Sequence, residues 1–428
     1  MTGATVLRLN SRPLSARDLA VEMFEQLRIK TFDGVGITRE CYGDGENVAF
    51  DLYRKVAESH GLVCQPDAAA NLIISLPNDD GAQPALIVGS HTDSVPQGGN
   101  YDGAAGIIAG LLCLLRLHSE NILLPFPVRV IVLRAEESAF YGRANIGSRT
   151  IFGGLSANDL AAKSRGTGRT LREAMVSAGV DIDRVERGER IFDPAQAREY
   201  LELHIEQGPI MVARRLPTSV VTGIRGNLRH RKVVCRGEAG HSGAVPRWLR
   251  RDAMFAVSDL LMRLDEHWNH LLERGLDLVI TAGIVSTNPS EHAISRIPGE
   301  LQFSFEVRSQ SYDTLEAFYE LFRSECRAIG KERHVIFEFD ERVYTEPAKM
   351  DEGIVKRLLR ASEKLALPTE AMASGAGHDA AVFANAGIPS GMIFVRNANG
   401  SHNPNEEMDI DDFMLGVELM FGFLTASN

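Results

Sequence analysis

The feature that most constrains the fold is a short apolar run that leads into a polar, glycine-rich segment and then into a helical pattern. The apolar run covers 85–88, the polar segment 89–103 and the helical pattern 104–118, and a second buried strand is predicted at 128–133. A strand, a helix and a strand in this order form a βαβ unit, whose parallel strands end at the same edge of a sheet. Open α/β sheets bind ligands at that edge. The polar segment is therefore a candidate site.

Two kinds of pattern divide the rest of the chain. Helical spacing at 14–30, 50–60 and 354–365, a helix-rich region at 155–197 and strands at 71–76 and 392–395 extend the α/β pattern. Between them, period-two strands at 231–235, 278–281, 301–307 and 335–339 alternate with helical patterns at 252–274 and 312–329. A chain of 428 residues is also too long for one compact core. We predict an α/β domain with a mostly parallel central sheet flanked by helices, built from 1–223 and 342–428, and an inserted α+β domain at 224–341.

Composition excludes several classes of protein. A net charge of −11 argues against a nucleic-acid-binding surface, which needs clustered basic residues. The five cysteines are scattered and form no CxxC pair, so we expect neither a disulfide framework nor a thiolate zinc site, and a reducing cytoplasm fits best. The longest apolar stretch falls short of the ~18 residues that suggest a membrane span, and the N-terminus lacks a signal pattern. We therefore expect a cytoplasmic protein with no nucleic-acid or membrane partner.

Histidines and carboxylates follow several of the predicted strands, and none of these candidates carries sulfur. They are His91, Asp102, Glu137, His204 and His402. Imidazole and carboxylate ligands suit Zn²⁺ and tolerate Mn²⁺ or other first-row ions. Five ligands are too many for one catalytic zinc that keeps an open position, so two metals that share a carboxylate are the simplest interpretation.

Two further carboxylates complete this interpretation. In the Glu136-Glu137 doublet, one carboxylate can bind metal while its neighbour serves as general base and then acid on an activated water. Asp93, two residues after His91, is placed to accept the other ring N–H of that histidine. Taken singly, each of these residues is more often structural: a lone histidine is usually not a ligand, and an aspartate in a glycine-rich loop is usually a turn former. The five positions together favour the metal site.

The motifs resemble a known family, the dinuclear-metal aminoacylase and carboxypeptidase superfamily. Within it, the chain is similar to the branch of N-carbamoyl-L-amino-acid hydrolases, β-ureidopropionase and allantoate amidohydrolase, from about residue 50 onward. The motifs that carry the resemblance are Gly89-Ser90-His91-x-Asp93-Ser94-Val95, Gly98-Gly99-x-Tyr101-Asp102-Gly103, Leu203-His204-Ile205-Glu206-Gln207-Gly208-Pro209, Gly375-Ala376-Gly377-His378-Asp379-Ala380 and Ser401-His402-Asn403-Pro404. The run around His204 separates this branch from the peptidases.

The resemblance assigns roles to these residues. It implies two divalent ions per subunit, Zn²⁺ first and Mn²⁺, Co²⁺ or Ni²⁺ as alternatives, with Asp102 as the bridge and Glu136 as the base. The inserted domain would be a lid and dimerisation domain, whose His241, reaching in from the partner subunit of a homodimer, would stabilise the oxyanion. Arg308 would bind the substrate carboxylate. Further substrate contacts implied are Ser295, Gln207, Asn227, Gly377 and His378.

The chain departs from the family pattern on the substrate side. Ser295-Arg296 stands where the family has Asn-Val before Ile-Pro-Gly, residues 138–141 replace the usual Gly-Ser-Arg-Phe, and the lid loop at 244–248 is altered. None of these changes touches a predicted metal ligand. The reaction class is therefore still predicted, but the substrate is not determined. We expect hydrolysis of a linear amide or ureido bond. The alternatives are a dipeptidase or N-acyl-amino-acid deacylase with the same metals, and a catalytically inactive ligand-binding paralogue.

Overall fold

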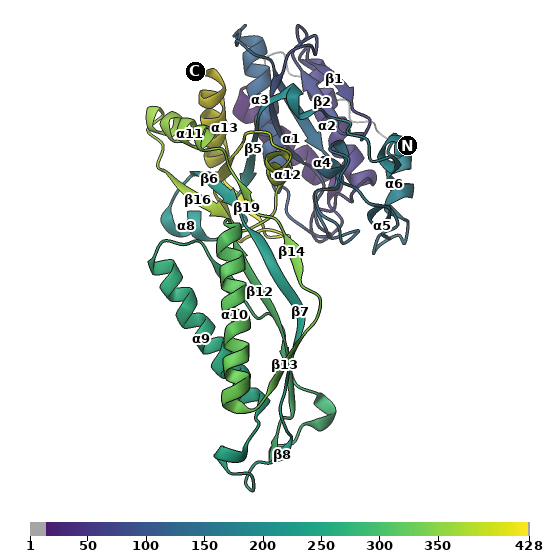
Figure 1. Cartoon of the computed structure of the whole chain (residues 1–428). Coiled ribbons are helices and arrows are strands. Elements are labelled where there is room, and N and C mark those ends of the chain that lie inside the picture. Colours follow the sequence, from purple (N-terminus) through teal and green to yellow (C-terminus); the bar gives the residue numbers. More distant parts are fainter. Residues whose placement is uncertain (1–13, 427–428) are drawn as a thin grey trace. The chain divides into compact units, whose positions relative to one another are not determined.

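The computed structural model describes residues 14–426 and divides into two units (Figure 1). The first contains the described residues up to Thr222, together with Met350–Met372 and the chain from His378 onward. The second contains Gly223–Lys349 and Ala373–Gly377. The second unit continues to Lys349, beyond the predicted boundary at 341, because β14 (Val343–Thr345) still pairs with β7 (Gly226–Arg236).

The first unit is built on a mixed sheet in the order β1-β2-β4-β3-β5-β17-β6, with β16 also paired to β6. Its four central strands, β4, β3, β5 and β17, run parallel to one another, whereas β1, β2 and β6 are antiparallel to their neighbours. This confirms the predicted α/β fold with a mostly parallel sheet. The strands are β1 Val63–Pro66, β2 Leu72–Ser75, β3 Ala85–His91, β4 Val128–Leu133, β5 Ala197–Ile205, β6 Thr218–Ile224, β16 Thr369–Ser374 and β17 Ser390–Val395.

Helices cover this sheet and form the main core with it. α3 (Ala104–Ser119) and α13 (Ile410–Thr425) are both rich in apolar residues. α3 is therefore buried along most of its length, where it packs against β3, β5 and α13. The remaining longer helices are α1 Ala16–Thr31, α2 Asp44–Ser59 and α11 Glu352–Lys364. The helix-rich region predicted at 155–197 contains three short helices joined by turns and loops, α5 Ala157–Leu160, α6 Leu171–Ser177 and α7 Ile182–Glu186. Within residues 14–426, no helix is both long enough and apolar enough to cross a membrane.

The second unit is a separate α+β structure, in which a six-stranded antiparallel sheet packs against two long helices. β12 (Glu300–Ser309) alternates strictly between buried and half-buried residues, because one face of the sheet lies under α9 (Ala253–Glu273) and α10 (Tyr312–Arg333). The stacked rings of Phe305 and Phe322, 3.8 Å between centroids, join β12 to α10. The other strands are β9 Val279–Thr281, β10 Val285–Ser286 and β13 Ile336–Phe339. A separate two-stranded pair joins β8 (Gly240–His241) to β11 (Arg296–Ile297).

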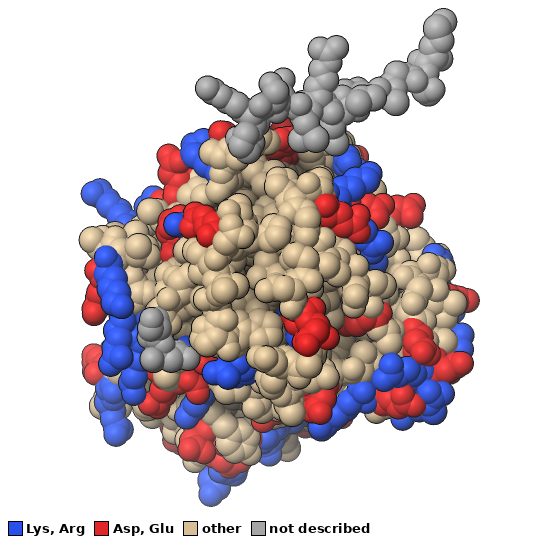
Figure 2. Space-filling view, turned by 90° about the horizontal axis from the view of Figure 1, so that it is seen from above, with Lys and Arg blue, Asp and Glu red and all other residues tan. Residues whose placement is uncertain are grey.

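Charge on the surface is mixed. On the face drawn in Figure 2, Lys and Arg side chains alternate with Asp and Glu around a central area of other residues, and neither sign forms a continuous patch among the described residues of that face. Such mixed charge is ordinary for one face of a globular protein.

Candidate metal centre

The candidate ligands gather where the four central parallel strands end. His91 is the last residue of β3, Glu137 follows β4, His204 is the penultimate residue of β5, and His402 follows β17. Asp102 lies just before α3. The sequence predicted that these ligands follow the strands, but His91 and His204 belong to the strands themselves. Strand geometry therefore holds these two imidazoles, which is a more rigid support than a loop.

Asp102 joins the five side chains into two groups of three. In the first, Asp102 Oδ1 lies 3.4 Å from His91 Nε2 and 3.1 Å from His204 Nε2. In the second, Asp102 Oδ2 lies 3.4 Å from His402 Nε2, which is 3.1 Å from Glu137 Oε1. Within each group the ligand atoms all lie within 4.8 Å of one another. One carboxylate thus faces both groups, one oxygen toward each.

The charge state of this cluster fits a cation site. Burial alone would raise the pKa of Asp102, but the close contacts with His204, His402 and His91 hold it well below its usual value. Despite these contacts, Asp102 Oδ1 is buried without a hydrogen bond of acceptable geometry among the described residues. An anionic oxygen left in this state has a strong preference for a positive charge. The nitrogen and oxygen donors suit zinc, manganese, cobalt or nickel, so the residues fit the predicted divalent ions.

Hydrogen bonds also orient the two buried imidazoles. His204 Nδ1 lies 2.9 Å from the Ile205 carbonyl oxygen, to which it donates, so the neutral ring keeps a lone pair on Nε2. The Gly103 N–H donates to that Nε2 over 3.2 Å. His91 Nδ1 lies 3.1 Å from the backbone oxygen of Asp93 and 3.3 Å from its carboxylate Oδ1. Asp93 thus faces the ring as expected, although its backbone oxygen is the closer partner.

Left-handed backbone conformations bring the loops close to these ligands. Gly103 has φ +64°, and a Cβ there would lie 2.5 Å from the His91 ring, so only glycine fits. His402 and Gln207 adopt φ of +62° and +63° although neither is glycine. Such strained residues persist where the surrounding contacts hold them, which is common at functional sites.

The carboxylate of Asp93 has a second role that the sequence did not indicate. Its Oδ1 accepts the N–H of Glu136 and its Oδ2 the N–H of Glu137, each over 2.9 Å. The Cys41 thiol also donates to Oδ2 over 3.1 Å. Asp93 therefore fixes the backbone of the glutamate doublet to the loop that carries His91.

Three buried charged residues support the same loops, and sequence reasoning missed them. Glu46 accepts a hydrogen bond of 2.5 Å from Arg134 and one of 2.8 Å from the N–H of Ala135, directly before the glutamate doublet. Arg39, fully buried, donates to the backbone oxygens of Thr92 and Asp102. Charged residues are rarely buried unless they are paired, but no local pattern marks these three in advance.

Glu136 lies beside the ligands without joining either group. Burial raises its pKa well above the ordinary value; the positive charge of His91 opposes that rise, and the charges of Glu137 and Asp379 add to it. Its Oε1 accepts a hydrogen bond of 3.0 Å from Asn145 Nδ2. A raised pKa suits a group that must take up and release a proton near neutral pH.

Two of the predicted substrate contacts lie in the first unit. Gln207 Nε2 donates to Asp102 Oδ2 over 2.7 Å, and its Oε1 is buried without a hydrogen bond among the described residues. His378 is buried with its ring centroid 4.4 Å from that of His204. Burial lowers the pKa of His378 well below the ordinary value, which favours the neutral ring.

The other predicted contacts lie in the second unit. Arg308 Nε lies 3.0 Å from Glu306 Oε2, and an Nη1–H donates over 3.1 Å to the carbonyl of Gly375, two residues before Gly377. Asn227 lies opposite Arg308 in the β7–β12 ladder, and its Oδ1 is buried without a hydrogen bond among the residues described. This places an amide and a guanidinium next to each other.

His241 and Ser295 are in the part of the second unit that holds β8 and β11, and both are exposed. His241 Nδ1 accepts the N–H of Gly243 over 3.1 Å, so the neutral ring carries its proton on Nε2 and can donate from there. The Ser295 carbonyl accepts the N–H of Ser242 over 2.8 Å. Arg296, which lies opposite His241, pairs with Glu291 at 2.6 Å.

His402 gives the centre a pH-dependent property. Hydrogen bonds to Asp102 and Glu137 raise the pKa of His402 to about 11, above the ~6.5 of a free histidine. The pairing therefore stabilises the metal-free fold fully below about pH 6.5, and this stabilisation is lost only as the pH rises through about 11.

Because a ligating imidazole must be neutral, metal binding at pH 8 is expected to release the proton of His402. Titration calorimetry of the metal-free protein in buffers of different ionisation enthalpy would measure the release, and His402→Ala is expected to remove about one proton from it. Equal proton release by both proteins would contradict the assignment.

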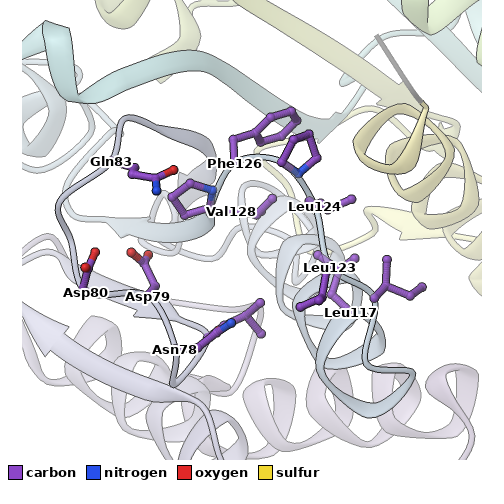
Figure 3. Close-up of a pocket in the computed structure, with 13 residues that line it drawn as sticks. Asn78, Asp79, Asp80, Gln83, Leu117, Leu123, Leu124, Phe126 and Val128 are labelled. Carbon is purple, nitrogen blue, oxygen red and sulfur yellow. The ribbon is translucent and has the colours of Figure 1, made fainter.

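A cavity of about 240 Å³ lies elsewhere in the first unit (Figure 3). Its lining includes Asp79, Asp80, Gln83, Phe126 and Val128, which lie near the starts of β3 and β4. The candidate ligands lie near the ends of the same strands. The cavity therefore belongs to the opposite edge of the sheet, and Asp79 there is already paired with Arg129 at 2.6 Å.

Comparisons with known proteins agree with this arrangement. Residues 87–426 match the family described as Peptidase family M20/M25/M40. The chain is 32% identical over 387 residues to an N-carbamoyl-L-amino acid amidohydrolase of Geobacillus stearothermophilus, covering 90% of this chain and 92% of the relative. It is 30% identical to an allantoate amidohydrolase of Escherichia coli, covering 90% and 91%. Among solved structures, an amidase of the hydantoinase/carbamoylase family from Burkholderia multivorans superposes with a TM-score of 0.84 at 25% identity, covering 97% and 98%. The chain therefore belongs to the M20/M25/M40 peptidase family, in the hydantoinase/carbamoylase branch.

Proposed function

We propose that the protein is a dinuclear metal-dependent amidohydrolase that cleaves a linear C–N bond, most simply that of an N-carbamoyl amino acid or an allantoate-like substrate. The observation that carries this proposal is the pair of ligand groups that share Asp102, with Glu136 beside them. His91 and His204 would hold one ion, and Glu137 and His402 the other. Zn²⁺ is the first candidate, and Mn²⁺, Co²⁺ or Ni²⁺ also suit such a donor set. When bound, the ions lower the pKa of water and polarise a carbonyl.

Glu136 would move the protons of the reaction. Asn145 occupies its Oε1, so the other carboxylate oxygen would take a proton from the attacking water and then deliver it to the leaving nitrogen. One carboxylate acting as base and then as acid returns to its starting state in each turnover. Burial raises the pKa of Glu136, which makes its carboxylate a stronger base toward water, and this supports the proposed use.

The second unit would bind the rest of the substrate. The Nε2–H of His241 would donate to the carbonyl oxygen, where negative charge develops. Arg308 would bind a carboxylate through its planar guanidinium, and Asn227 beside it would add an amide. Gln207, His378, Gly377 and Ser295 would complete the contacts. Because Ser295-Arg296 replaces an amide and an apolar residue of the family pattern, the preferred substrate within the class is expected to differ from that of relatives that keep the pattern.

We also propose that two copies associate through the second unit and that His241 acts on the partner's site. β10 is an edge strand, and its Val285 is exposed next to an exposed Ile284. Phe255 and Met262 are exposed on α9. An unpaired strand edge and exposed apolar residues are typical of an association surface. We also propose a reducing cytoplasm as the site of action, because the five cysteines are scattered in the sequence and form no CxxC pair.

Complementation tests the association. His241→Ala and Glu136→Gln are each expected to be nearly inactive alone. If His241 acts in trans, a mixed dimer of the two variants contains one site in which both residues are intact. Mixing the variants under conditions that allow subunit exchange is then expected to restore activity, up to about half of the wild-type rate per mixed dimer. No recovery, with mixed dimers shown by mass spectrometry, would rule out action in trans.

A substrate panel tests the reaction class. The metal-loaded enzyme would be assayed for ammonia release from N-carbamoyl amino acids and allantoate, and for amine release from dipeptides and N-acyl amino acids. We expect kcat/KM for a ureido substrate to exceed that for dipeptides by at least about 100-fold. Preference for a dipeptide or an N-acyl amino acid would support the deacylase alternative. Two bound metals without turnover of any substrate would support a binding protein instead.

A further inference from the structure

We infer that Asn145 is a positioning residue for Glu136, holding one carboxylate oxygen so that the other is free for proton transfer. The inference rests on the proposed function, because it assigns Asn145 a role through the general base. Asn145 Nδ2 lies 3.0 Å from Glu136 Oε1 and 3.3 Å from Asp379 Oδ1. One amide group thus lies between two carboxylates from distant parts of the chain.

The chemistry of the neighbours determines which way this amide faces. A primary amide has two N–H donors on its nitrogen and only acceptor capacity on its oxygen. The nitrogen faces both neighbouring carboxyl groups, and each can take one of its two hydrogens. Asp379 is fully buried and is itself held by the Ser148 hydroxyl at 2.5 Å. Asn145 therefore separates two buried acidic groups and gives both a donor.

The backbone of Asn145 fixes the amide from the other side. The Asn145 N–H donates to the Glu136 carbonyl over 2.7 Å, and the N–H of Ile146 donates to the Ala135 carbonyl over 2.8 Å. Asn145 has φ +54° and is the N-cap residue that precedes α4 (Ile146–Ile151). The residue that contacts the carboxylate of Glu136 is thus also bound to the peptide group of Glu136, which leaves its side chain little freedom.

A purely conformational role is the competing explanation. Asparagine, aspartate and glycine all tolerate a left-handed backbone, so a turn that needs only this conformation would accept each of the three. If the side chain positions Glu136, the three residues are expected to differ in activity. Glycine keeps the backbone and removes the donor, whereas aspartate keeps the shape but places a third carboxylate between Glu136 and Asp379. The two substitutions therefore distinguish the explanations.

Asn145→Gly and Asn145→Asp test the inference in the metal-loaded enzyme. We expect Asn145→Gly to lower kcat by about 10–100-fold, the usual effect of losing a supporting hydrogen bond at such a site, with KM changed by less than about threefold. Asn145→Asp is expected to lower kcat further. Two bound metals and an unchanged circular dichroism spectrum are expected for both. Asn121, which is exposed and has φ +52°, provides the matched control: Asn121→Gly and Asn121→Asp are expected to keep wild-type kcat.

A double-mutant cycle with Glu136→Gln separates the ways in which the inference could fail. If Asn145 acts through Glu136, Asn145→Gly lowers kcat in the wild-type background but not in the Glu136→Gln background. Wild-type kcat in both Asn145 variants, with Glu136→Gln inactive, would overturn the positioning role and leave the proposed function standing. A loss of kcat that accompanies loss of metal or of fold would overturn it as well. Full activity of Glu136→Gln would show that another group is the base, and it would overturn the positioning role of Asn145 together with the proposed role of Glu136.

Discussion

Replacing Glu136 by glutamine is expected to lower kcat by about 10²–10⁴-fold while the fold and the metal content stay unchanged. Glutamine keeps the shape of the side chain and can still meet the Asn145 amide through its own oxygen. It cannot accept a proton from water or deliver one to a leaving nitrogen. Steady-state rates, metal analysis and circular dichroism of the same preparation would measure the three quantities.

The neighbouring glutamate provides the control. Glu137 belongs to a candidate ligand group and Glu136 does not, although their backbone N–H groups are held by the same Asp93 carboxylate. Glu137→Gln is therefore expected to lose metal together with activity, whereas Glu136→Gln loses activity alone. If Glu136→Gln turned over substrate at the wild-type rate, another group would have to be the base.

The second large effect is expected for Asp102→Asn. Asp102 is the one residue that both ligand groups share, so the change removes a negative charge from both at once. Each ion contributes several kcal/mol of transition-state stabilisation, and 1.36 kcal/mol corresponds to a factor of ten. We therefore expect activity to fall by more than about 10³-fold. Metal analysis after gel filtration is expected to show that neither ion is retained.

Substitutions in only one ligand group are the controls for the metal loss expected of Asp102→Asn. His204 belongs to the first group and His402 to the second, so His204→Ala and His402→Ala are each expected to lose about one ion rather than two. Asparagine has nearly the same volume as aspartate, so a gross change of fold is not the expected cause of the loss in Asp102→Asn. Retention of two ions by Asp102→Asn would show that this residue is not the bridge.

The local patterns of the sequence were sufficient to predict the helices and strands named below and the types of side chain at the candidate site. The apolar run before His91 and the helical pattern after it correspond to β3 and α3. The alternation over 301–307 corresponds to β12, whose buried face lies under two helices. These predictions hold because side-chain periodicity is set by the backbone geometry of each element. The same patterns also located the candidate ligands, because most of these ligands follow or end a buried strand.

The supporting contacts could not be predicted in the same way. Arg134 meets Glu46 across 88 residues of sequence, and Asn145 meets Asp379 across 234. Arg39 reads as an ordinary surface cation in the sequence, yet it is fully buried beneath the loop of His91 and Asp102. Whether a charged or amide side chain is solvated or buried depends on which distant segments pack over it, and no local period records that.

The sequence by itself determined the α/β fold, the candidate nitrogen and oxygen ligands and the presence of a carboxylate doublet after β4. Only the tertiary structure decided that Asp102 faces both ligand groups, that Asp93 holds the backbone of the doublet and that Asn145 separates Glu136 from Asp379. The physical reason is the distance along the chain over which each kind of information acts. Periodicity acts over a few residues along one element, whereas a buried polar group finds its partner wherever chain packing brings a complementary atom within hydrogen-bond distance.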